Sequence, residues 1–209
     1  MFGTHDLSLF ILSGLLLNIT PGADSLYIAT RSVSQGVRAG FAAAFGIGTG
    51  CFVHVFAAAL GVSAILAASS IAFTAVKLAG AAYLVYMGLS LLRSKSTVAT
   101  SAPTLPAASL PAVFWQGFLT NVLNPKVALF FLAFVPQFIE SSAPSKVLAF
   151  LFLGTIFILN GTLWCLFLAW ISSRLGALNI GSRATTWLRS SVGGLFVILG
   201  VRLALTKQG

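Results

Sequence analysis

Long apolar runs alternate with short polar stretches along the whole chain. A helix needs about 20 apolar residues to cross the hydrocarbon core of a bilayer. Because lipid leaves no partner for an unpaired backbone amide, runs of this length predict helices, not strands. We therefore expect six transmembrane helices, at roughly Leu7 to Thr30, Gly40 to Leu66, Ile71 to Leu92, Val113 to Phe138, Val147 to Ser172 and Trp187 to Thr206.

Polar, helix-breaking stretches interrupt the first and the fourth of these runs. The first contains Asn18-Ile19-Thr20-Pro21-Gly22-Ala23-Asp24, and the fourth contains Asn121-Val122-Leu123-Asn124-Pro125-Lys126. In each stretch a residue suited to cap a helix N-terminus, Thr20 or Asn124, precedes a proline that would take the first helical position. We expect each span to stop at its break and to restart as a new helix within the membrane.

The composition agrees with a membrane protein and excludes an ordinary soluble domain. The 209 residues are 58% hydrophobic and 7% charged, with a mean hydropathy of +1.01. The net charge of +9 is spread over loops and helix ends, so we expect no nucleic-acid partner. Cys51 and Cys165 lie in separate apolar runs without metal-ligand spacing. We therefore expect no disulfide framework, no metal site and no cofactor.

The distribution of the cations predicts an orientation. The odd-numbered connections between spans hold Arg31, Arg38, Arg93, Lys95, Arg174 and Arg183. The even-numbered connections, on the opposite side of the membrane, carry few cations. By the positive-inside rule the odd-numbered connections are cytoplasmic and both termini are periplasmic. The N-terminal run follows no Lys or Arg, so we interpret it as a retained span and not as a cleaved signal peptide.

The chain divides into two halves of three spans each, residues 1–92 and 113–209, joined by the Ser-, Thr-, Ala- and Pro-rich cytoplasmic linker 93–112. An odd number of spans inserts the second half upside down relative to the first. Many secondary transporters have this inverted-repeat plan, with the binding site near the midplane on broken helices. The two restarted helices would then direct their N-terminal amides at one central volume, where a carboxylate fits.

Asp24 is the only carboxylate well inside a predicted span. Its insertion costs about 2.5 to 3.5 kcal/mol, which favours a functional role as a proton carrier or as the partner of a substrate ammonium. Alternatively, it stabilises the first turn of its helix or pairs with Lys126. Lys126 stands where the helix dipole repels a cation. Its partner could be a substrate carboxylate or Asp24, or its ammonium could reach water in a structural role.

The other polar residues of the breaks leave two interpretations open. They could bind substrate, or they could only form hydrogen bonds with the carbonyl groups freed by the prolines. These residues are Asn18, Thr20, Asn121 and Asn124. Gly22 lies in the first break beside Pro21. For Pro21 and Pro125 the alternative is a simple kink, which their paired occurrence makes less favoured.

His54 lies at the end of a face of small residues, Ala42, Gly46 and Gly50, that repeat every four positions. This spacing favours close helix packing, either within the chain or in a homodimer. The imidazole could relay protons near neutral pH, or it could be a hydrogen-bonded packing residue.

The chain resembles the lysine exporter superfamily (LysE/RhtB type) of bacterial inner-membrane amino-acid exporters. The resemblance runs almost end to end and rests on the segments NITPGADSLYIATRSVSQGVRAGFAAAFGIGTG, HVFAAALGVSAIL, AVKLAGAAYLVYMGLSLLR, GFLTNVLNPKVALFFLAFVPQFI and GGLFVILGVRLAL. Where the family commonly has a PGPD-like run, this chain has Pro21-Gly22-Ala23-Asp24, which keeps the carboxylate and should soften the break. The resemblance implies amino-acid efflux driven by proton antiport, with both breaks lining the path.

We therefore expect a secondary exporter of a neutral, homoserine-like or threonine-like amino acid, coupled to protons and embedded in the lipid bilayer of the bacterial inner membrane. A cation exporter or a passive channel could use the same polar site. An intramembrane enzyme built on Cys51, His54 or Asp24 is disfavoured. No third group orients the histidine, and an apolar environment keeps a thiol inert.

Overall fold

The computed structural model describes residues 2–64, 70–93, 106–140 and 142–175, with isolated positions between 190 and 205. This part of the chain is helical and contains no sheet, only one bridge between Thr4 and Ile139. Its elements are, in order, α1 (Leu7–Ile19), α2 (Ala23–Gln35), α3 (Val37–Ala57), η1 (Ala58–Val62), α5 (Ser70–Arg93), α6 (Leu110–Val122), α7 (Pro125–Leu129), η2 (Phe130–Phe134), η3 (Val135–Phe138) and α8 (Lys146–Leu175).

Between two and four membrane spans can be assigned in this part of the chain. Two unbroken stretches, Val37–Val62 and Lys146–Arg174, are long and apolar enough to cross a bilayer. Two bent pairs qualify as one span each: α1 with α2, bent by 54°, and α6 with the segment Pro125–Phe138, bent by 46°. The predicted breaks in the first and fourth helices are therefore confirmed. The predicted third helix is α5, which does not qualify by the same criterion, and the sixth lies almost wholly outside the described residues.

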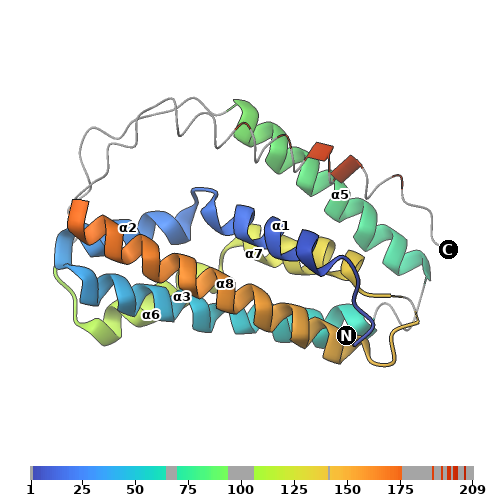
Figure 1. The fold of residues 1–209 in the computed structure, drawn as a ribbon, viewed down its shortest axis with the longest axis horizontal. Helices are drawn as coiled ribbons and strands as arrows, with labels where there is room; N and C mark the ends of the chain where they lie inside the picture. The colour runs from blue at the N-terminus through green and yellow to red at the C-terminus, as the bar shows by residue number, and fades with distance from the viewer. Residues whose placement is uncertain are drawn as a thin grey trace.

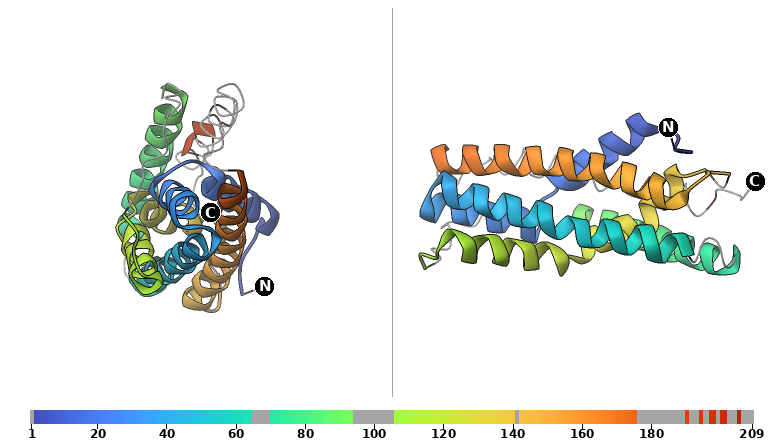
Figure 2. Two further views of the ribbon diagram at one scale, coloured as in Figure 1. Left: turned by 90° about the vertical axis from the view of Figure 1, so that its left-hand side faces the viewer. Right: turned by 90° about the horizontal axis from the view of Figure 1, so that it is seen from below.

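Helix α3 lies at the centre of the bundle, packed against α2, α6 and α8, while α5 runs along one side (Figures 1 and 2). The N-terminus and the start of α8 lie at one end of the elongated molecule, and the junction of α2 with α3 lies at the other. Phenylalanines fill the core near η2, where Phe130 contacts the rings of Phe10, Phe134 and Phe157. Large apolar side chains face outward along the helices, as expected for a lipid-facing surface.

The small-residue face of α3 packs directly on the backbone of α6. A Cβ added at Gly46 would lie 2.1 Å from the carbonyl oxygen of Phe114, and one at Gly50 would lie 2.7 Å from that of Phe118. Only glycine permits so close an approach of two helices. The predicted packing role of this face is confirmed, and the packing is intramolecular. A homodimer would therefore have to use a different surface.

The break in the first span differs from the prediction at Thr20. Its backbone amide and its side-chain hydroxyl both donate to the carbonyl oxygen of Leu16, at 3.0 and 2.7 Å. Thr20 therefore ends α1, and the N-cap of α2 is Gly22, without a side-chain hydrogen bond. The prediction that Thr20 caps the restarted helix was wrong, because its hydroxyl is already used on the preceding turn.

The second break follows the prediction. The side chain of Asn124 accepts a hydrogen bond from the amide of Lys126 at 3.0 Å, and Pro125 takes the first position of α7.

Arg31 was expected in a loop but lies inside α2, only 4% exposed. Helix α2 continues to Gln35, and a single residue, Gly36, separates it from α3. Gly36 has φ 84° and ψ 177°, a conformation that is essentially restricted to glycine and lets the chain reverse at once. Arg31 is therefore not a loop charge, and it contributes less to the predicted orientation than a loop cation would.

Candidate functional site

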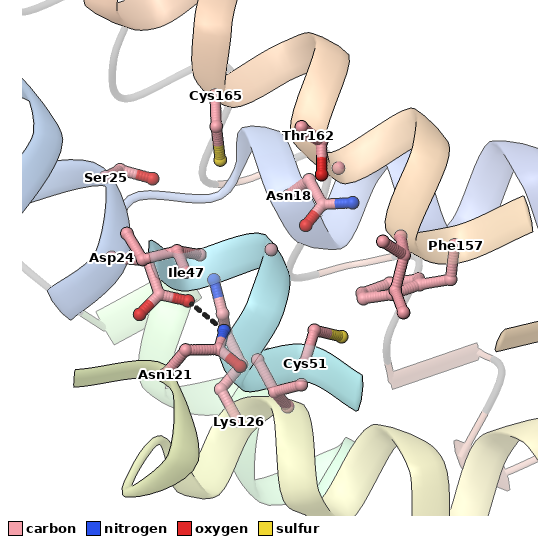
Figure 3. Close-up of a pocket in the computed structure, with 14 residues that line it drawn as sticks. Asn18, Asp24, Ser25, Ile47, Cys51, Asn121, Lys126, Phe157, Thr162 and Cys165 are labelled. Atoms are coloured by element: carbon pink, nitrogen blue, oxygen red, sulfur yellow. Dashed lines mark hydrogen bonds between the residues drawn. The ribbon is translucent and has the colours of Figure 1, made fainter. Parts of the chain in front are cut away.

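The two breaks lie against each other through the carboxylate of Asp24. Asp24 is the second residue of α2 and is buried. Its Oδ2 accepts a hydrogen bond from the side-chain amide of Asn121 at 2.9 Å (Figure 3). It accepts a second hydrogen bond from the side-chain amide of Asn124 at 3.0 Å. Asn121 lies in the last turn of α6, and Asn124 is the N-cap of α7. One break therefore supplies the carboxylate, and the other supplies the donors that hold it.

Lys126 lies in the second break, and its side chain reaches the end of α1 at the first break. Its Nζ donates to the carbonyl oxygens of Leu17 and Thr20, both at 3.1 Å. These carbonyls end α1, where the Pro21 break removes their helical partners and where the helix dipole favours a cation. Lys126 therefore caps α1. It forms no ion pair with Asp24, since the only ion pair within the described ranges joins His5 and Asp6.

A cavity of about 30 Å³ lies where α1, α2, α3, α7 and α8 meet. That volume holds about two water molecules, so no amino acid fits the site in this arrangement of the helices. Figure 3 shows the polar and apolar side chains that converge on it. The lining residues are Asn18, Asp24, Ser25, Ile47, Gly48, Cys51, Asn121, Lys126, Val127, Phe157, Ile158, Gly161, Thr162 and Cys165.

Three buried polar atoms of residues that line the cavity have no hydrogen-bond partner. They are Oδ1 of Asp24, Oδ1 of Asn121 and Nδ2 of Asn18. A buried polar atom without a partner costs about 1–3 kcal/mol, so such atoms indicate a place for water or a ligand. Oδ1 of Asp24 and Oδ1 of Asn121 are hydrogen-bond acceptors, and Nδ2 of Asn18 is a donor. The site can therefore bind a molecule that carries both a cationic donor and an anionic acceptor.

His54 supports this site from behind and does not line the cavity. Its Nε2 lies 2.9 Å from the main-chain carbonyl oxygen of Asn121. Because a carbonyl can only accept, Nε2 carries the proton and donates it. The geometry agrees with a hydrogen-bonded packing histidine, the second of the two sequence interpretations. His54 fixes the main chain of Asn121 while Asp24 holds its side chain.

Sequence reasoning missed the contribution of α8 to the site. Phe157, Gly161 and Cys165 of α8 follow one another at four-residue spacing on one helix face, and this periodicity is the signal that could have revealed them. Cys51 of α3 lines the same cavity, and both cysteines are buried and free. Within the described part of the chain, no three His, Cys, Asp or Glu residues are grouped to hold a metal ion. Thr20 and Pro21 stay outside the cavity lining, at the end of α1 and in the break.

Bent helices whose breaks meet at a buried polar cavity define a membrane transport protein. The chain belongs to the LysE type translocator family, whose sequence profile matches residues 15–207. The resemblance seen in the sequence is thereby confirmed, and the protein is a translocator and not an enzyme.

Similar proteins cover nearly the whole chain. An uncharacterized membrane protein of Pseudomonas aeruginosa is 34% identical over 97% of this chain and 96% of its own length. A homoserine/homoserine lactone efflux protein of Salmonella typhi is 30% identical over 95% of this chain and 96% of its own. A leucine efflux protein of Salmonella choleraesuis is 28% identical over 99% and 98%. No solved structure gives a significant match.

Proposed function

We propose that the chain exports amino acids with neutral side chains, either aliphatic or of the homoserine and threonine kind, from the bacterial cytoplasm. The observation that carries this proposal is the Asp24 carboxylate, whose Oδ2 is fixed by Asn121 and Asn124 while its Oδ1 has no partner. The names of the relatives, efflux proteins for leucine and for homoserine, support the same substrate class.

Each part of such a substrate has a counterpart around the cavity. The ammonium group is bound by the free oxygens of Asp24 and Asn121, and the carboxylate accepts from the amide of Asn18. Apolar side chains such as Ile47 and Phe157 complete the lining and suit an aliphatic substituent. The site offers a single carboxylate, which the ammonium group already uses. A second, cationic group on the substrate would find no counter-charge there.

Proton antiport follows from competition for Asp24. When the carboxylate is ionised it binds the substrate ammonium, and when it is protonated it no longer attracts a cation. Substrate release to the outside allows a proton to bind Asp24, and proton release to the cytoplasm restores the ionised form. Because one group binds either the substrate or the proton, each moves only in exchange for the other.

The architecture that supports this cycle is an inverted repeat of six spans in the inner membrane. The two bent pairs are the first and fourth spans, and their breaks brace each other through Asp24 and Lys126. Rocking of residues 1–92 against residues 113–209 then exposes the cavity to one side at a time. In this topology both termini are periplasmic, and the linker 93–112 is cytoplasmic.

Uptake of labelled amino acids into inverted membrane vesicles tests the proposal. Wild-type vesicles with an acidic interior are expected to accumulate leucine, homoserine or threonine above the external concentration. Asp24→Asn should lose this accumulation at least tenfold, because the new side chain cannot ionise. It should still fold, since its carbonyl oxygen can accept from both Asn121 and Asn124.

Two outcomes would overturn the proposal. Equilibration without accumulation would indicate a passive channel, and gradient-driven movement of an inorganic cation without any amino acid would indicate a cation exporter. Unchanged proton coupling in Asp24→Asn would remove the assigned role of that residue while leaving amino-acid export standing.

A further inference from the structure

A buried guanidinium lies on the same face of α2 as Asp24, away from the cavity. Arg31 follows Asp24 by seven residues, which is two helical turns or about 10 Å along the axis. It is 4% exposed, and it lies in the C-terminal part of α2, where it contacts Pro106, which precedes α6, and Gln116 of α6. The break around Pro21 does not account for Arg31, and the transport cycle described above does not use it.

Among the described residues, every hydrogen-bond partner of the Arg31 guanidinium is neutral. Nη1 donates to Oε1 of Gln35 at 2.6 Å and to the carbonyl oxygen of Pro106 at 2.9 Å. Nη2 donates to Oε1 of Gln116 at 2.7 Å, and the Tyr27 ring centroid lies 5.7 Å away. The third guanidinium nitrogen, Nε, is buried and has no hydrogen-bond partner among the described residues.

The acidic residues of the chain cannot neutralise this charge in the closed structure. The sequence holds three of them, Asp6, Asp24 and Glu140. Asp6 pairs with His5 beside the N-terminus, and the amide of Glu140 bonds to Gly3 at the same end. Among the described residues no carboxylate lies within ion-pair distance of Arg31. A buried charge without a counter-ion is unfavourable, so this position favours an anion that arrives from outside the protein.

Arg31 is better suited to that anion than Lys126. The Lys126 ammonium already has two carbonyl oxygens at the end of α1, where the helix dipole also favours it. A guanidinium, in contrast, presents parallel N–H groups that match both oxygens of a carboxylate. Nε and Nη2 form such a pair on Arg31. Only the Nη2 bond to Gln116 has to be exchanged, and the Gln116 side chain is exposed and able to move.

We propose that Arg31 is the carboxylate-binding residue of a second, entry subsite on the export path. It captures the carboxylate of the amino acid at the α2–α3 end of the bundle before the ammonium group reaches Asp24. This inference rests on the proposed function, because it takes the substrate to be an amino acid. A carboxylate bound to Arg31 replaces the contact with Gln116, to which Tyr27 also donates at 3.0 Å, and loosens the attachment of α2 to α6.

Two leucine analogues separate the subsites. N-acetyl-leucine keeps the carboxylate and lacks the ammonium group, whereas leucinamide keeps the ammonium group and lacks the carboxylate. Binding of leucine and of both analogues is measured by titration of the purified full-length protein, for wild type, Arg31→Gln, Arg31→Lys and Asp24→Asn. Arg31→Gln should weaken N-acetyl-leucine at least tenfold and change leucinamide less than twofold. Asp24→Asn should weaken leucinamide at least tenfold and change N-acetyl-leucine less than twofold. The affinity of Arg31→Lys for N-acetyl-leucine should lie between those of wild type and Arg31→Gln.

The inference is wrong if Arg31→Gln binds both analogues as wild type does, or if it weakens both equally, as loss of a structural residue would. Should Arg31→Gln not fold, Arg31→Lys carries the same test, because it keeps the charge and loses the paired donors. If wild type binds leucine while the Arg31 variants show no analogue preference, only the entry subsite fails. If wild type binds and transports no amino acid, the proposed function fails with it.

Discussion

Asn121 donates from its side-chain amide to the carboxylate of Asp24, 97 residues earlier in the chain, at 2.9 Å. The main-chain carbonyl of the same residue accepts a hydrogen bond from His54 at 2.9 Å. Asn121 thus joins α2, α3 and α6 at one point, and its remaining oxygen, Oδ1, is left for a ligand. The position of the carboxylate therefore depends on this side chain together with that of Asn124.

Asn121→Ala is expected to destabilise the protein by about 1–3 kcal/mol, because it removes a hydrogen bond to a charged, buried group. Asp24→Leu removes the same hydrogen bond by deleting its acceptor, the carboxylate. Together the two changes should cost less than the sum of their separate effects, by about 0.5–3 kcal/mol. Unfolding of the purified variants in detergent measures these free energies. Strict additivity would show that the contact contributes nothing to stability.

Lys126→Met is expected to lower the unfolding free energy by about 1–3 kcal/mol, since two carbonyls at the end of α1 lose a charged donor. Lys146→Met makes the same chemical change at the first residue of α8, outside the site, and serves as the control. Thermal unfolding in detergent compares the two. Equal and small effects would contradict the capping role of Lys126.

Gly46→Ala should disrupt the contact between α3 and α6, because the new Cβ would lie 2.1 Å from the carbonyl oxygen of Phe114. Overpacking of this kind costs about 1–3 kcal/mol, and here a main-chain atom must move. Gly61→Ala is the matched control, since its Cβ would meet no atom of the described residues within 4 Å. The yield of folded protein and its melting temperature report the difference. A Gly46 variant as stable as the Gly61 variant would show that the two helices can separate freely.

Cys165 offers a direct test of whether substrate occupies the cavity. Its side chain and that of Cys51 line the same space and are buried, so a small thiol reagent reaches them only when the helices open. In a Cys51→Ala background, saturating leucine should slow labelling of Cys165 several-fold, whereas an excluded sugar should not. Mass spectrometry of the labelled protein gives the rates. Labelling that leucine leaves unchanged would place the binding site elsewhere.

The breaks could be located from the sequence because their chemistry is local. Proline, glycine and asparagine within an apolar run interrupt a helix whatever surrounds them, so the bends after Ile19 and Val122 were predictable. The role of Asn124 as an N-cap followed from the same reasoning. Thr20 shows the limit, since a threonine before a proline can end one helix as readily as it begins the next.

The long-range half of the site could not be read from the sequence. Whether Lys126 reaches Asp24 or the end of α1 depends on how two distant breaks are placed, which no local pattern specifies. Arg31 was counted as a loop residue because nothing in the spacing shows that α2 continues to Gln35 and turns on one glycine. The face of α8 at Phe157 and Cys165 looks like any other apolar stripe until its neighbours are known.

One glycine stands at each end of α2, so that this helix is a rigid segment between two flexible joints. Gly22 precedes its first residue, and Gly36, at φ 84°, follows its last. A rigid segment of this kind transmits displacement along its length, so a movement that begins at Arg31 must also reposition Asp24. Communication between the two ends then needs no relay of side chains through the core. Stiffening either joint, for example by Gly36→Ala, should hinder movement of the whole helix even though neither charged group has been touched.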